Sequence, residues 1–101
     1  MLSKNFLSEN YDSQEYSSEY EAGYYHDQSY LQLVLPLSEI YVDSEHKHLV
    51  IGSAGADGIE FCLRQKSTGV WAYYPNEGVF EKVAENINEL VKGWASGSIK
   101  V

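Results

Sequence analysis

The chain has 101 residues, a length that fits a single domain. Its 15 acidic residues outnumber 7 basic ones and give a formal net charge of −8. This balance serves solubility, disfavours direct binding to nucleic acid or an anionic membrane, and favours a basic partner. Cys62 is the single cysteine, which excludes an intramolecular disulfide. The sequence shows no signal-peptide pattern and no run of the ~18 apolar residues of a membrane span, so we expect a cytoplasmic protein.

The N-terminal segment, residues 1–29, differs in composition from the domain that we place at residues 30–101. Residues 1–30 hold six of the nine tyrosines and six carboxylates against one lysine. Few aliphatic side chains accompany them, so this segment has little with which to build a core of its own.

Two interpretations of this acidic, tyrosine-rich segment remain open. Tyr16, Tyr20 and Tyr24 follow the i, i+4, i+8 spacing of one helical face, which favours a helix within residues 5–22. The serine and glutamate content fits a disordered acidic arm instead.

Short β-type runs follow. Alternating leucines over residues 31–35 predict a strand that ends at Pro36, because proline cannot donate to a ladder. Residues 37–43 fit a short turn or helical loop. Residues 49–51 form a second, brief apolar run.

The next segment predicts a meander. Residues 52–58, GSAGADG, read as a turn in which Asp57 and Gly58 tolerate the positive φ of a hairpin. The alternation over residues 59–63 marks a half-buried strand, and the aromatic run 70–74 marks another. We therefore expect three strands in meander order, with the first strand beside them.

An apolar stripe of helical period runs through the C-terminal third from residue 79 onward. Asn86 can cap a helix and Glu89 completes a capping-box-like pair, so we place the helix at residues 87–96 with Gly97 as its stop. The face expected to bury consists of Ile87, Leu90, Val91 and Trp94. The fold class is then α+β: a small, mainly antiparallel sheet of four to five strands with a C-terminal amphipathic helix on one face.

Two runs of the sequence also carry a likeness to a known family. They are LVIGSAGADGIEFCLRQKSTGVWAYYP, residues 49–75, and VAENINELVKGWASG, residues 83–97. In their order and spacing these runs resemble the SUKH superfamily, the cell-wall-assembly-regulator-like proteins found widely among bacterial toxin immunity proteins. The resemblance covers about residues 30–97 and implies a module that binds another protein. Family members usually carry a longer N-terminal helical region, so a shortened domain would dimerise or cover its sheet with residues 1–30.

Catalytic and cofactor chemistry finds little support in the sequence. Gly52, Gly55 and Gly58 could form an anion nest, but no GK[ST] and no helix follow, so a turn is the better interpretation. Cys62 has no base paired with it in sequence and fits a packing role. We expect no enzyme, no catalytic residues and no cofactor.

Two histidines are the candidates for metal binding. His46 and His48, with Asp43 and Glu45 nearby, would share one face of a strand. A defined site needs three or four ligands, and the sequence does not specify the rest. We therefore predict no metal site.

The aromatic strand offers candidates for partner contact. Trp71 and Tyr73 should point to one face and Tyr74 to the other. Either one set packs while the other is exposed, or both faces are covered. Arg64 could pair with a nearby carboxylate.

The charge and the resemblance together predict an immunity-type protein that binds and neutralises a cognate toxin, such as a basic nuclease domain. The residues expected to contact that partner are Glu15, Glu19, Tyr20, Tyr24, Asp57, Tyr74 and Glu77. The alternative is a regulatory or scaffold module that self-associates, as a homodimer, without a toxin partner.

Overall fold

A computed structural model of the chain describes residues 22–101 except 29, 44, 46–47, 56–57 and 66. Of the predicted N-terminal segment, residues 1–29, the structure describes only residues 22–28, and Tyr24–His26 form a β-strand there. Residues 1–21, which hold nearly all of the predicted helix, lie outside the described residues. The described elements are β1 (Tyr24–His26), β2 (Leu31–Val34), the 3₁₀ helix η3 (Leu37–Glu39), β3 (Tyr41–Val42), β4 (Leu49–Ser53), β5 (Glu60–Leu63), β6 (Val70–Tyr74), β7 (Val79–Ala84) and α2 (Ile87–Ser96).

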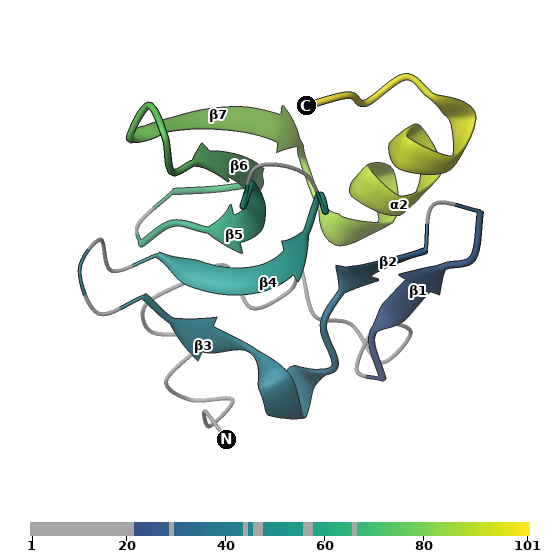
Figure 1. The fold of residues 1–101 in the computed structure, drawn as a ribbon, viewed down its shortest axis with the longest axis horizontal. Coiled ribbons are helices and arrows are strands. Elements are labelled where there is room, and N and C mark those ends of the chain that lie inside the picture. The colour runs from purple at the N-terminus through teal and green to yellow at the C-terminus, as the bar shows by residue number, and fades with distance from the viewer. Residues whose placement is uncertain (1–21, 29, 44, 46–47, 56–57, 66) are drawn as a thin grey trace.

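The strands form two antiparallel sheets. β3 to β7 make a five-stranded sheet in the order β3-β4-β5-β6-β7, and β1 pairs with β2 in a two-stranded sheet. Figure 1 shows α2 and the β1–β2 hairpin grouped beside the larger sheet. The α+β fold class is confirmed, and the expected meander is β4-β5-β6.

The first predicted strand, β2, lies against the larger sheet without joining its ladder. The backbone N–H of Leu35 donates to the carbonyl of Ile51 at 2.6 Å. Gly52 permits the approach, since a Cβ there would overlap the carbonyl oxygen of Leu33. The register of β4 against β5 shifts between Val50 and Gly52, which marks a bulge at this crossing.

The apolar stripe of helical period that begins at residue 79 does not form a helix over its first part, because residues 79–84 form the strand β7. Residues 79–84 share the stripe's spacing but pair with β6, with Phe80 opposite Tyr73 and Val79 opposite Tyr74. The turn between them is closed by the N–H of Gly78, which donates to the carbonyl of Tyr74 at 2.8 Å. Gly78 has a φ of 68°, a conformation that glycine adopts without strain. Hairpin chemistry therefore overrides the helical periodicity in this segment.

The predicted helix is confirmed with its ends. The side-chain oxygen of Asn86 accepts a bond from the N–H of Glu89 at 2.7 Å. Gly97 closes the helix in the left-handed region at φ 81°, with its N–H bonded to the carbonyl of Trp94. Local chemistry is thus sufficient to set both helix termini.

The helix packs on one face of the sheet, as predicted. Ile87, Leu90 and Val91 are buried, while Trp94 is half-buried with its ring edge-on to Phe61 at 5.8 Å between centroids. Each fully buried side chain of this size contributes about 1.5–3 kcal/mol. The core around them comprises Leu33, Val34, Ile40, Leu49, Ile51, Ala54, Ile59, Phe61, Leu63, Val70, Ala72, Ala84, Ile87, Leu90 and Val91.

The opposite face of the sheet carries a separate set of side chains. Cross-strand pairing aligns Val50, Cys62 and Trp71, and it aligns Glu60 with Tyr73 and Phe80 in the next row. Directly opposed residues share a face, so this set points away from α2.

Candidate functional site

An aromatic layer covers this second face of the sheet. It consists of His48, Glu60, Arg64, Trp71, Tyr73 and Phe80. The ring centroids of His48 and Tyr73 are 4.8 Å apart, and that of Phe80 lies 4.7 Å from Tyr73 and 5.2 Å from His48. These distances are within the range of favourable aromatic pairing.

Arg64 stacks on this layer. Its Cζ atom lies 4.2 Å from the ring centroid of Phe80 and 5.1 Å from that of Trp71. Both distances permit cation–π attraction. The sequence suggests that Arg64 could pair with a carboxylate. Among the described residues, the contacts found for its guanidinium are these two rings.

The carboxylate of Glu60 on β5 contacts Tyr41 on β3 and His48, which directly precedes β4. One oxygen lies 3.1 Å from Nε2 of the buried His48, and the other accepts a bond from the Tyr41 hydroxyl at 3.1 Å. Burial, with added repulsion from Glu60 and Asp43, raises the pKa of Tyr41 above its ordinary value. The phenol therefore keeps its proton and acts as the donor to Glu60.

Cys62 lies in the same face and is fully buried. Burial raises the pKa of its thiol to about 12, an effect that the Glu60 carboxylate increases and Arg64 partly offsets. A thiol that stays protonated at neutral pH is a poor nucleophile, which agrees with a packing role.

An open groove lies at the edge of the aromatic layer. Its volume is about 760 Å³, and we call it the acidic groove. The described lining residues are Asp43, Glu45, Gly58, Glu60, Tyr73, Pro75, Asn76, Glu77 and Gly78. Four of these are carboxylates and none is basic, so the groove favours a cationic occupant.

The acidic groove draws residues from distant parts of the sequence. The β3–β4 turn supplies Asp43 and Glu45, β5 supplies Glu60, and the β6–β7 turn supplies Glu77. Tyr73 forms part of the wall. Burial, with added repulsion from Asp43, Glu45 and Glu60, raises its pKa above the ordinary value.

The predicted contact residues occupy different places. Glu77 is exposed in the acidic groove. Tyr74 and Tyr24 are half-buried and pack against the core on the helix side. The remaining four, Glu15, Glu19, Tyr20 and Asp57, lie outside the described residues.

The prediction that Trp71 and Tyr73 face one side of the sheet and Tyr74 the other is confirmed. None of these three aromatic side chains is fully exposed. Tyr73 is buried on the second face, Trp71 is half-buried there, and Tyr74 packs on the core. Burial, with added repulsion from Glu81 and Glu77, raises the pKa of Tyr74.

The sequence patterns do not assign several residues to this site. Tyr41 and Phe80 lie on strands that these patterns do not predict, and the sequence points to His48 only as a candidate metal ligand. Glu60 could have been found, since it alternates with apolar neighbours on a strand and so must face the second side of the sheet.

The former metal candidates do not converge among the described residues. His48 is buried against Glu60, and His46 lies outside the described residues. Across the part of the chain that the structure describes, no group of three or more His, Cys, Asp or Glu side chains could hold a metal ion. None of the described helices has the length and apolar character needed to cross a membrane.

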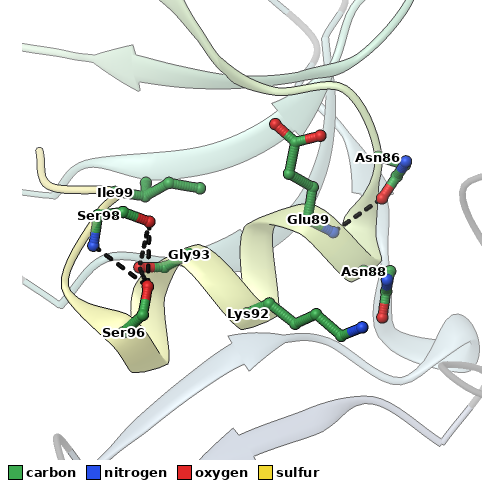
Figure 2. A pocket seen from close by; sticks show the side chains of 8 residues that line it. All are labelled: Asn86, Asn88, Glu89, Lys92, Gly93, Ser96, Ser98 and Ile99. Carbon is green, nitrogen blue, oxygen red and sulfur yellow. Dashed lines mark hydrogen bonds between the residues drawn. The ribbon is translucent and has the colours of Figure 1, made fainter.

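A second groove runs along α2 and has a volume of about 520 Å³. It is lined by Asn86, Asn88, Glu89, Lys92, Gly93, Ser96, Ser98 and Ile99 (Figure 2). The C-terminal tail folds back here, since the N–H of Ile99 and the hydroxyls of Ser96 and Ser98 all donate to the carbonyl of Gly93. Its lining mixes amides, hydroxyls and one charge of each sign, so it has no strong charge preference.

Comparisons of the chain with protein-family models, with curated proteins and with solved structures find no match. The resemblance to the SUKH superfamily therefore stays a prediction from residues 49–75 and 83–97.

Proposed function

We propose that this protein is a non-enzymatic binding module that captures and neutralises a basic toxin domain through the acidic groove. The observation that carries the proposal is the convergence of four carboxylates in one open groove without a basic residue among its described lining. The proposed setting is the cytoplasm.

The electrostatics of the groove suit a basic protein surface. Glu45 and Glu77 are exposed, so lysine or arginine side chains of a partner can reach them. Complementary charge speeds the encounter of two proteins and makes the association sensitive to salt. The net charge of −8 extends this attraction beyond the groove itself.

The scaffold under the groove is well ordered by its contacts. Glu60 is held by His48 and Tyr41, and the ring of Tyr73 contacts the rings of His48 and Phe80, which also contact each other. A preorganised surface loses little entropy on binding, which favours tight association for a given contact area.

Support for a binding role also comes from the state of the reactive groups. The Cys62 thiol is buried and protonated, and the His48 ring lies against Glu60 inside the aromatic layer. Neither group is presented to a substrate in the acidic groove.

The experiment is an affinity capture of the tagged full chain from its native cell lysate at low and high salt, with mass spectrometry. The test variant carries Glu45→Lys and Glu77→Lys. The matched control carries Glu39→Lys and Glu89→Lys, which make the same charge change at exposed residues outside the groove.

We expect the unaltered chain and the control to retain one basic toxin domain at low salt and to lose most of it at high salt. The groove variant should bind it on the order of tenfold more weakly or worse. Equal retention by the groove variant and its control would contradict a role for the groove. Recovery of only the protein itself would favour the self-associating module instead.

A further inference from the structure

The tip of the β1–β2 hairpin holds an unusual residue. Tyr30 has a φ of 55°, and it is the one non-glycine residue with a positive φ among those the structure describes. Its side chain is 82% exposed, more than any other large apolar side chain there. The backbone N–H of Tyr30 donates to the carbonyl of Asp27 at 3.3 Å, which closes the turn.

Tyrosine is a costly choice for this position. A side chain with a Cβ is strained in the left-handed region, and glycine or asparagine occupies it more easily. Burial does not offset the strain, because the ring of Tyr30 is almost fully in solvent. A strained and exposed aromatic is better explained by contact with a partner than by folding.

The hairpin is fixed to the body of the protein and presents further contact groups. Tyr24 packs against the core, and β2 is held against β4 at Gly52. Tyr25 is 47% exposed on the same hairpin, and the side chain of Asp27 is exposed at its turn. Exposed tyrosines on a rigid frame are efficient interface anchors, because they bury a large area while losing little side-chain entropy.

We propose that the β1–β2 hairpin tip is a protein-contact site with Tyr30 as its anchor. The partner surface offers an apolar slot for the phenol ring, next to a lysine or arginine that meets Asp27. In taking the partner to be basic, the proposal rests on the function proposed above.

The first arm of the test is photo-crosslinking in the native cell. The full chain carries p-benzoylphenylalanine in place of Tyr30, and the control carries it in place of Val101, which is 39% exposed and lies outside both the hairpin and the lining of the acidic groove. We expect a covalent adduct with one basic protein from position 30 and none from position 101. An adduct that forms equally from both positions, or from neither, overturns the proposal.

The second arm separates strain from recognition. Tyr30→Asn relieves the backbone strain and removes the ring, so its Tm should rise by roughly 4 °C while retention of the crosslinked protein falls at least tenfold. Tyr30→Phe keeps both the ring and the strain, so its Tm and its retention should stay near those of the unaltered chain. Retention by Tyr30→Asn that equals the unaltered chain's overturns the anchor role and leaves the acidic groove standing. An adduct at position 30 with a protein that is not basic keeps Tyr30 as a contact residue. It contradicts the basic partner and, with it, the proposed role of the acidic groove.

Discussion

Gly93→Ala sets two opposing effects against each other in α2. Alanine in place of glycine in a helix interior stabilises the helix by about 1 kcal/mol. A Cβ at Gly93, however, would overlap the end of the Ile99 side chain and lie 2.5 Å from its Cγ1. The Ile99 side chain must then move away from its packing position against α2, and the C-terminal residues next to it move as well (Figure 2).

The cost of that displacement follows from the contacts of Ile99. Its side chain is half-buried against the core, and complete burial of an isoleucine contributes about 1.5–3 kcal/mol, so roughly 1 kcal/mol is lost. The bond from its N–H to the Gly93 carbonyl, 3.0 Å long, contributes about 1 kcal/mol more. The net effect of Gly93→Ala in the full chain is a destabilisation of about 1 kcal/mol.

The sign should reverse when Ile99 is already absent. In an Ile99→Ala chain the Cβ has room, so Gly93→Ala should stabilise by about 1 kcal/mol. Urea unfolding of the four chains gives the coupling between the two residues, which should be about 2 kcal/mol. If Gly93→Ala stabilises both the unaltered chain and the Ile99→Ala chain, the close packing of Ile99 against Gly93 is refuted.

Three further predictions test other parts of the structure. Asn86→Ala should lower the free energy of unfolding by about 1 kcal/mol in urea titration, because the cap on α2 is lost; no change would argue against capping. Gly52→Ala should destabilise by about 3 kcal/mol or prevent folding, because its Cβ would overlap the carbonyl of Leu33, and near-native stability would rule out the close crossing of β2 over β4. The Cys62 thiol, with its pKa raised from 9.0 to about 12, binds a proton that the unfolded chain releases above about pH 9. Stability should therefore fall as pH rises through that range, by up to about 1.4 kcal/mol per pH unit, and Cys62→Ala should lack this component when unfolding is followed from pH 8 to 10.

Local chemistry explains why some elements could be predicted. Asn86 and Gly97 satisfy the backbone groups at the two ends of α2, so its bounds follow from neighbouring residues alone. β5 could be predicted because its residues alternate between apolar and polar, and β6 could be predicted because it is rich in aromatic residues. In each case the pattern lies within a few residues of the element that it specifies.

Other elements depend on partners far away in the chain. β7 has helical spacing, and only its pairing with β6 makes it a strand. β3 has only two residues and is a strand because its backbone pairs with that of β4. Short segments of this kind have too little intrinsic preference to be read in isolation.

The sequence by itself determined the acidic character of the protein, its α+β class, the central meander and the capped C-terminal helix. Tertiary structure alone decided that Glu77 shares a groove with Glu45 and Glu60, and that Arg64 stacks on Phe80. The physical reason is that strand register and turn geometry fix which side chains meet across the sheet, and no local pattern encodes these long-range pairings.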